Sequence, residues 1–483
     1  MSMSLPRKSP KELGISASKV LDFINYLEAH SIEMHSLMLL RHGHVAAEGW
    51  WNPYEPELPH MLFSLSKSFT STAIGLAVQE GKLSVDDPVI SFFPNELPAE
   101  VSKNLSAMRI KHLLMMGTGH AFDTTSDMHQ APDGNWARAF LALPVEHEPG
   151  THFLYNTGAT YMLSAILQKV TGQTLLQFLQ PRLFEPLGIS NPSWESCPQG
   201  INTGGYGLKI RTEDIAKFGQ LYLQKGMWQG QRLVNEDWIA EATAKQIANG
   251  DGGESDWAQG YGYQFWRCRH GLYRGDGAFG QFCIVMEEWD AVLAMTGGTN
   301  DLQGVMNGAW EHLIAAFKSS SDVDKETEAG ELDELLQDRL NQLQLEPPCL
   351  QQEPQLQWER DANKSDYQLE SNPLMLETIQ IEFLANTAIL QIRAAGTDHR
   401  IELGRQRWVH DRTSLFGGEE RIVGSFTWNE QGQLLLTIQR IEAPFCITIT
   451  LEYKGVDNEL ELQISWNASF EQAAPPAVRG RRL

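Results

Sequence analysis

The sequence is poor in basic residues and has no long apolar run. Its 38 Lys and Arg residues are outnumbered by 61 Asp and Glu residues, which gives a formal net charge of −23 at pH 7. Nucleic acids and anionic membrane surfaces bind basic patches, so this balance argues against both partners. No apolar stretch approaches the length needed to cross a bilayer, which argues against a transmembrane helix.

Cysteine is also scarce. The five cysteines are scattered and show no Cys-x-x-Cys spacing: Cys197, Cys268, Cys283, Cys349 and Cys446. An odd number without a motif favours reduced thiols that pack in the interior. The first eight residues are polar and contain no apolar segment, so we expect no signal peptide. These features predict a cytoplasmic protein.

Several catalytic motifs are absent. The chain has no Gly-x-Ser-x-Gly sequence, which argues against the nucleophile elbow of an α/β-hydrolase. It has no His-Glu-x-x-His sequence or comparable metal spacing, and His42 and His44 lie in a turn that is more typical of a polar hairpin. No glycine-rich loop of the phosphate-binding kind precedes a helix. We therefore expect no metal and no cofactor.

The most informative stretch that is present runs from His60 to Thr70. It contains Ser64 and, three residues later, Lys67, and it opens an apolar pattern of helical spacing. Residues i and i+3 share one face of a helix, so the ammonium can stand beside the hydroxyl. The helix dipole favours a developing alkoxide there. The pattern indicates a nucleophilic serine without a histidine, although Ser-x-x-Lys alone also occurs at solvated helix starts.

Two further elements follow. Residues 150–158 place Tyr155, Asn156 and Thr157 on a turn before an apolar helix that ends at Gly172. A tyrosine and an amide or hydroxyl on such a turn can reach one pocket, whereas a lone tyrosine more often closes a loop. Residues 273–281 form a glycine-rich strand entry, which is typical of a place where backbone comes close to another group or of an ordinary hairpin corner.

In this order the three elements resemble the motifs of the serine β-lactamase and penicillin-binding-protein superfamily. That superfamily uses Ser-x-x-Lys, then Tyr-x-Asn or Ser-x-Asn, then Lys-Thr-Gly. The chain is most similar to the class C β-lactamase-like esterases and peptidases, over roughly residues 10–318. The resemblance implies an α/β (α+β) fold of β-lactamase-like type. Its antiparallel sheet would come from residues 35–50 and 262–298, with a mostly helical lobe between them.

The resemblance also implies catalytic roles. Ser64 would be the acylated nucleophile, and Lys67 would help to accept its proton. Tyr155 would be the general base, with its phenol pKa lowered by the nearby ammonium. Thr157 stands where the family usually has asparagine, so the polar orienting group is either Thr157 or, if the turn is rotated, Asn156.

In the third motif, Ala278, Phe279 and Gly280 occupy the Lys-Thr-Gly position. The oxyanion hole would then be the backbone N–H groups of Ser64 and Gln281. In the family, the missing lysine and hydroxyl help to bind a substrate carboxylate. Arg274 is one candidate to restore a cation and Asp276 one to bind an amine, and both are equally compatible with solvated surface charges.

This departure favours a small ester or amide over a β-lactam, so an esterase is the leading expectation. A D-amino-acid peptidase or amidase and a β-lactamase are the alternatives among hydrolases. A non-catalytic protein that binds peptide-like ligands in the same pocket is an alternative of another class. Whether the chain forms a homo-oligomer is left open.

The length of 483 residues suggests more than one domain. We expect a hydrolase domain at 1–318, a polar linker and an amphipathic helix at 319–350, and a C-terminal domain at 351–483. The helix follows from leucines at helical spacing between 332 and 343. The last domain has short alternating runs separated by glycine and asparagine turns, which predicts an antiparallel β-sandwich or barrel. It carries no recognisable chemistry.

Overall fold

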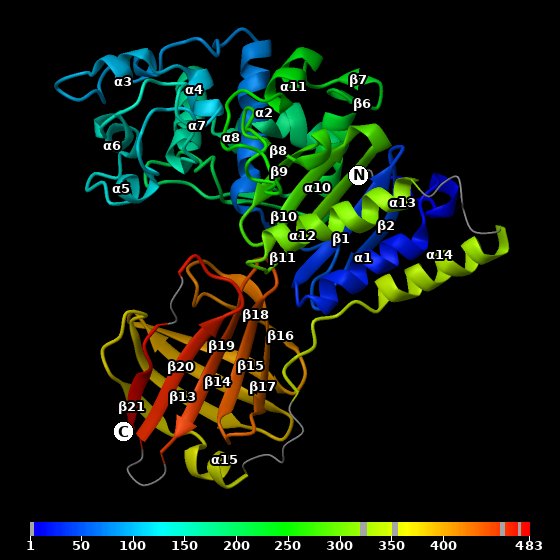
Figure 1. The fold of residues 1–483 in the computed structure, drawn as a ribbon. Coiled ribbons are helices and arrows are strands. Elements are labelled where there is room, and N and C mark those ends of the chain that lie inside the picture. The colour runs from blue at the N-terminus through cyan, green and yellow to red at the C-terminus, as the bar shows by residue number, and fades with distance from the viewer. Residues whose placement is uncertain (1–3, 319–325, 350–355, 455–458, 472–474) are drawn as a thin grey trace. The chain divides into compact units, whose positions relative to one another are not determined.

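The computed structural model describes residues 4–318, 326–349, 356–454, 459–471 and 475–483, and the chain divides into two compact units (Figure 1). Unit 1 comprises residues 1–49, 59–297 and 301–341, and unit 2 comprises residues 50–58, 298–300 and 342–483. The domain boundaries expected from the sequence, at 318 and 350, stay a prediction. Part of the expected linker, 319–325, lies outside the described residues.

Unit 1 is built on a six-stranded sheet in the order β2-β1-β11-β10-β9-β8. The four strand pairs from β1 through β8 are antiparallel. The strands are β1 (Met34–Arg41), β2 (His44–Trp50), β8 (Trp266–Arg267), β9 (Tyr273–Gly277), β10 (Gln281–Met286) and β11 (Ala291–Gly297). The sheet joins both ends of the unit, as predicted. Its central strands are mostly apolar and are buried along almost their whole length, because both faces of the sheet are covered.

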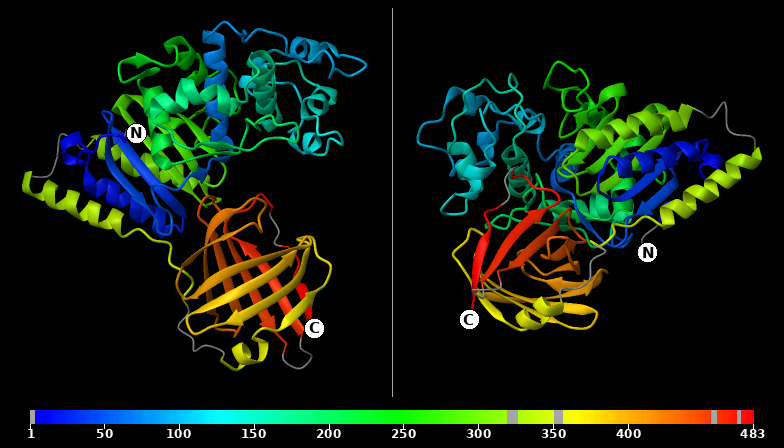
Figure 2. Two further views of the ribbon diagram at one scale, coloured as in Figure 1. Left: turned by 180° about the vertical axis from the view of Figure 1, so that it is seen from behind. Right: turned by 60° about the horizontal axis from the view of Figure 1, so that its bottom comes forward.

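Helices cover this sheet. α10 (Thr212–Leu223) packs against β1, β10 and β11. α1 (Ala17–Ala29) packs with α12 (Leu302–Gly308), α13 (Ile314–Lys318) and α14 (Glu326–Asn341), and Figures 1 and 2 show α1 and α14 side by side. α14 lies in the stretch where the leucine spacing predicts a helix. It buries Leu336 and Leu340 while Leu335 is 55% exposed.

A mostly helical region lies between β2 and β8 in the sequence. Besides α10, its helices are α2 (Ser66–Gln79), α3 (Lys103–Ala107), α4 (Ile110–Leu114), α5 (Thr125–His129), α6 (Trp136–Ala142), α7 (Thr157–Thr171), α8 (Leu175–Leu179), α9 (Glu185–Leu187) and α11 (Glu236–Thr243). Its short strands are β3 (His60–Met61), β4 (Ser193–Trp194), β5 (Leu208–Ile210), β6 (Met227–Trp228) and β7 (Gln231–Arg232). α2 is buried over most of its length and packs against α7. The helix end expected at Gly172 is confirmed, because Gly172 caps α7 in the left-handed conformation.

Unit 2 is a ten-stranded barrel. The strands are β12 (Asp366–Leu369), β13 (Leu376–Phe383), β14 (Thr387–Ala394), β15 (Thr397–Arg405), β16 (Val409–Thr413), β17 (Glu420–Trp428), β18 (Leu434–Arg440), β19 (Cys446–Tyr453), β20 (Glu459–Trp466) and β21 (Val478–Arg482). They follow the order β15-β14-β13-β12-β21-β20-β19-β18-β17-β16. A pairing between β15 and β17 closes the sheet on itself. The antiparallel β prediction is thus confirmed, and of its two forms the barrel is the one observed.

The barrel interior follows the alternation seen in the sequence most clearly in β19 and β20, where every second residue as far as Leu451 and Ile464 is buried. α15 (Leu356–Ala362) lies across one end, where Trp358 packs against the core (Figures 1 and 2). Residues 50–58 join this unit through Tyr54, whose hydroxyl donates to the Ala443 carbonyl at 3.0 Å and accepts from Gln439 Nε2 at 2.7 Å.

Within the described residues, no helix combines the length and the apolar character required to cross a bilayer.

Candidate active site

Ser64 lies in a 3-10 turn, Phe63–Leu65, directly before α2. The preceding residue, Phe63, has φ of 46°, a left-handed conformation that strains a bulky side chain. The two other serines of the segment, Ser66 and Ser68, are buried. Ser66 Oγ accepts from Leu208 N at 3.2 Å, and Ser68 Oγ donates to the Gln264 carbonyl at 2.9 Å. Of these three serines, Ser64 is the one that is partly exposed and available for reaction.

Lys67 is fully buried beneath that serine. Its Nζ donates to Ser64 Oγ at 3.0 Å, to Thr157 Oγ1 at 3.1 Å and to the Gly205 carbonyl at 2.8 Å. Burial lowers the pKa of this amine to about 7, against the opposing attraction of the Asp123 and Asp276 carboxylates. A substantial fraction of Lys67 is therefore neutral near pH 7 and able to accept a proton.

The Gly205 contact requires a glycine. A Cβ at this position would lie 2.6 Å from Thr157 Cγ2 and 3.4 Å from Lys67 Nζ. Any side chain here would therefore push Thr157 away from the lysine. The segment around Gly205 is glycine-rich, but a carbonyl acceptor has no signature in residue type, so the sequence did not reveal it.

Tyr155 lies beside Ser64 and Lys67. Its ring centroid is 4.9 Å from Lys67 Nζ and 5.1 Å from the Trp266 ring, on which it stacks at 29°. Burial and then the Asp276 carboxylate raise the pKa of the phenol, while hydrogen bonds with Ser64 and Trp266 oppose them in part. The expectation of a lowered pKa for Tyr155 is wrong, because desolvation of the phenolate raises this pKa. At neutral pH Tyr155 keeps its proton.

Asn156 and Thr157 have separate partners. Asn156 caps α7 through its Oδ1, which accepts from Gly158 N at 3.1 Å and from Thr124 Oγ1 at 2.9 Å. Its side chain is fully buried. Thr157 Oγ1, by contrast, accepts a hydrogen bond from Lys67 Nζ. The geometry therefore brings Thr157, and not Asn156, to the lysine.

Ala278, Phe279 and Gly280 form the turn between β9 and β10. Phe279 has φ of 67° and packs its ring edge-on against Phe63, with centroids 5.4 Å apart. Gln281 is fully buried, and its Nε2 donates to the Ala278 carbonyl at 3.1 Å and to the Gly297 carbonyl at 2.9 Å. This turn therefore packs against Phe63, the residue before Ser64. The oxyanion role of the Ser64 and Gln281 N–H groups stays a prediction.

Arg274 and Asp276 lie in β9 and are buried, so their interpretation as surface charges is wrong. Arg274 Nε donates to Asp276 Oδ2 at 2.8 Å, and Nη1 donates to the Asp256 carbonyl at 2.9 Å. The guanidinium also lies 4.4 Å from the centroid of the Trp257 ring. Arg274 is thus engaged by neighbouring residues, while the Asp276 carboxylate is close enough to affect the pKa of both Lys67 and Tyr155.

Comparison with known proteins places this arrangement in context. The family model described as "Beta-lactamase" matches residues 23–315. Among curated proteins, 6-aminohexanoate-dimer hydrolase of Paenarthrobacter ureafaciens is 23% identical over 308 residues, covering 60% of this chain and 78% of that protein. A putative D-alanyl-D-alanine carboxypeptidase of Escherichia coli strain K12 is 25% identical over 141 residues, covering 27% of this chain and 32% of that protein.

Two solved structures are similar in fold to part of this chain. A putative 6-aminohexanoate-dimer hydrolase from Bacillus anthracis aligns with a TM-score of 0.53 and 18% identity, over 62% of this chain and 83% of that one. EstCE1, described as a hydrolase with promiscuous acyltransferase activity, aligns with a TM-score of 0.51 and 17% identity, over 62% of this chain and 98% of that one.

Proposed function

The chain belongs to the beta-lactamase family, and from this premise we propose that it is a serine hydrolase whose acyl-enzyme forms on Ser64. One observation carries the proposal. A partly exposed Ser64 Oγ lies 3.0 Å from the buried Lys67 amine, whose pKa is about 7. A nucleophilic hydroxyl next to a base that is partly neutral at physiological pH is the arrangement that covalent hydrolysis requires.

The reaction has two halves. Ser64 Oγ attacks the carbonyl carbon of the substrate, and its proton passes to Lys67 Nζ. The bond from carbon to the leaving oxygen or nitrogen then breaks, and the leaving group takes up a proton. Tyr155, protonated at neutral pH, would donate that proton and recover one from the lysine. Water then hydrolyses the acyl-enzyme by the same transfers in reverse.

We assign a small, neutral ester as the preferred substrate. The position of the family's lysine holds Ala278, which carries no charge. The Arg274 guanidinium already donates a hydrogen bond to the Asp276 carboxylate. A substrate carboxylate brought to the β9–β10 turn would lose hydration without gaining a partner. This feature supports esters over penicillins and cephalosporins.

One observation favours a second candidate, an amidase for amine-bearing substrates. The Asp276 carboxylate accepts from Arg274 through Oδ2 and lies close enough to Lys67 to raise its pKa, so we propose its second oxygen, Oδ1, as the acceptor for a substrate ammonium. A relative that covers 60% of this chain has the name 6-aminohexanoate-dimer hydrolase. A cytoplasmic location and a homo-oligomer remain proposals as well, the first supported by the buried thiols of Cys197, Cys268 and Cys283.

A fluorophosphonate probe tests the proposal directly. We expect one adduct per chain, located by mass spectrometry on Ser64 and absent in Ser64→Ala. That variant should lose about 10³-fold to 10⁶-fold in kcat, as expected for loss of a nucleophile. Ser66→Ala is the matched control and should still be labelled. An adduct on Ser66 or Ser68, or no adduct on folded protein, would contradict the proposal, and the second result would favour a non-catalytic binder.

A further inference from the structure

The barrel of unit 2 encloses a cavity of about 470 Å³. Along β19, Ile447 and Ile449 line this cavity. Leu451, further along the same strand, lines a separate small space beside Trp358 of α15. The cavity therefore occupies the end of the barrel away from α15. Phe470, which lines it, is 72% exposed, so this end is open to solvent.

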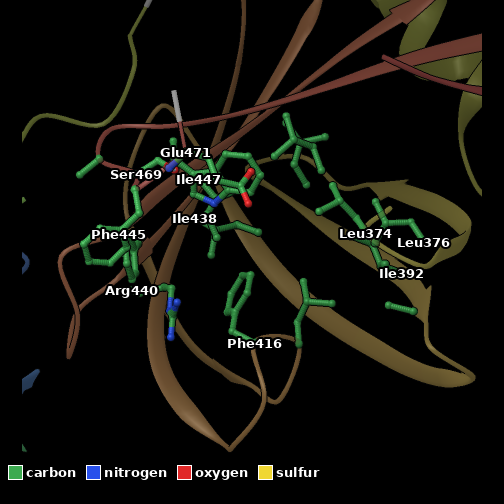
Figure 3. A pocket seen from close by; sticks show the side chains of 17 residues that line it. Leu374, Leu376, Ile392, Phe416, Ile438, Arg440, Phe445, Ile447, Ser469 and Glu471 are labelled. Carbon is green, nitrogen blue, oxygen red and sulfur yellow. The ribbon is translucent and has the colours of Figure 1, made fainter. Parts of the chain in front are cut away.

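The wall of the cavity is almost wholly apolar. Of the 17 residues that line it, all but Arg440, Ser469 and Glu471 are apolar (Figure 3). The inward side chains belong to strands held in register by the closed sheet, so they cannot collapse to fill the space. Its volume lies in the range of small-molecule sites. At about 30 Å³ for each water-sized group, it would admit on the order of 15 non-hydrogen atoms.

Arg440 is the one inward-facing charge of β18. It continues the alternating series Leu434, Leu436 and Ile438, at a position where the pattern calls for another apolar side chain. Its side chain is 14% exposed and forms a double hydrogen bond with Glu420, Nε to Oε1 at 2.6 Å and Nη2 to Oε2 at 3.0 Å.

The remaining nitrogen of this guanidinium, Nη1, has no hydrogen-bond partner in the part of the chain that the structure describes. The guanidinium carbon lies 4.9 Å from the Phe416 ring centroid and 5.3 Å from that of Phe445, and Figure 3 shows Arg440 between these two rings. The aromatic rings fix the group at the cavity wall. They leave one donor for an incoming acceptor.

The charges around the cavity select against an anion. Glu420 already neutralises Arg440, Glu471 adds a negative charge at the exposed rim, and the whole chain carries −23. An anionic head group would lose its hydration without a cation of its own. We propose that the barrel cavity binds an uncharged, mostly apolar small molecule through a single hydrogen-bond acceptor, which Arg440 engages.

The first test uses the full chain and the uncharged fluorophore N-phenyl-1-naphthylamine. We expect saturable binding of one molecule per chain, with the increase in emission that accompanies transfer to an apolar site. Methyl decanoate should displace the probe, and sodium decanoate should do so at least about tenfold less effectively, a difference of about 1.4 kcal/mol. No saturable binding, or equal displacement by the anion, would overturn the proposal.

Two neighbouring substitutions locate the site. Ile464 lines the cavity, whereas Ser465 is exposed on the other face of β20. Ile464→Trp should weaken probe binding at least about tenfold, and Ser465→Trp should leave it unchanged. Ile449→Phe adds less volume and provides the same test if Ile464→Trp does not fold. Unchanged binding in a folded cavity variant would place the probe elsewhere and refute the assignment.

Glu420→Gln tests the part played by Arg440. The amide keeps an acceptor for the guanidinium but removes the neutralising charge, so the cavity becomes cationic. The affinity for decanoate should rise about tenfold relative to methyl decanoate. Probe fluorescence and circular dichroism of the same preparation confirm that the barrel is folded. If the preference between ester and anion does not change, Arg440 does not contact the ligand and the proposal fails.

Discussion

Asn156 and Thr157 are adjacent in the sequence but serve different parts of the molecule. Asn156 Oδ1 accepts from Thr124 Oγ1 at 2.9 Å and caps α7, whereas Thr157 Oγ1 accepts from Lys67 Nζ at 3.1 Å. The first contact shapes the turn, and the second helps to hold the Lys67 amine. The polar group that the family usually places two residues after the tyrosine is therefore represented here by a threonine hydroxyl.

The hydroxyl of Thr157 should matter for catalysis. Thr157→Val keeps the shape of the side chain and removes one of the three acceptors around Lys67 Nζ. Because the amine is then held less firmly against Ser64, we expect kcat to fall about tenfold to 10²-fold. Thr157→Ser retains the hydroxyl and is the matched control. The measurement is kcat of each variant on one ester substrate. Equal kcat values for the valine and serine variants would show that the Thr157 hydroxyl does not assist catalysis.

Tyr155 and Lys67 should behave as one unit. Tyr155→Phe removes only the hydroxyl and keeps the ring stacked on Trp266, so it tests chemistry without making a cavity. We expect kcat to fall about 10²-fold to 10⁴-fold, in line with loss of general acid–base catalysis. Combining it with Lys67→Met should add little to the loss from the lysine change alone. Full activity of Tyr155→Phe would show that the phenol takes no part, and strictly additive losses would show that Tyr155 and Lys67 act independently.

Substrate preference should follow the missing cation at Ala278. We expect a higher kcat/KM for p-nitrophenyl butyrate than for nitrocefin on the same preparation, since a buried carboxylate without a partner costs several kcal/mol. Ala278→Lys restores the positive charge and should reduce the difference in kcat/KM between p-nitrophenyl butyrate and nitrocefin. Comparable or higher efficiency on nitrocefin with the unaltered chain would show that a cation other than Arg274 meets the carboxylate.

The fold was predictable because its signals are local and repetitive. The family resemblance implied a sheet built from residues 35–50 and 262–298, and the alternation at 434–438 and 447–451 predicts an antiparallel β domain. Closure of that β domain into a barrel depends on the β15–β17 pairing, which no local pattern encodes. Sandwich and barrel therefore could not be separated from the sequence.

The candidate site was predictable only where residue type carries the chemistry. Ser64, Lys67 and Tyr155 meet, as their spacing and family resemblance implied. The Gly205 carbonyl is a backbone acceptor without a signature in residue type. Burial, which raises the pKa of Tyr155, depends on the tertiary packing of Trp266 and its neighbours. Sequence reasoning that considered only the nearby ammonium therefore assigned the wrong sign to that shift.

The pH dependence of activity should report Lys67. Its pKa is lowered to about 7, so the neutral amine predominates above that pH, and kcat/KM should fall as the pH drops through about 7. Asp123 is exposed, and its carboxylate raises the pKa of Lys67. Asp123→Asn keeps an oxygen acceptor for Thr125 and removes the charge, so the acid limb should move to lower pH and the variant should retain more activity below pH 7.

Asp127→Asn is the control for this shift. It removes an exposed charge four residues away and should leave the acid limb of the pH profile in place. Added salt should reduce the difference between Asp123→Asn and the unaltered chain, because screening weakens the attraction from an exposed carboxylate. An acid limb that moves to higher pH, or that moves equally in both variants, would exclude Lys67 as the titrating base.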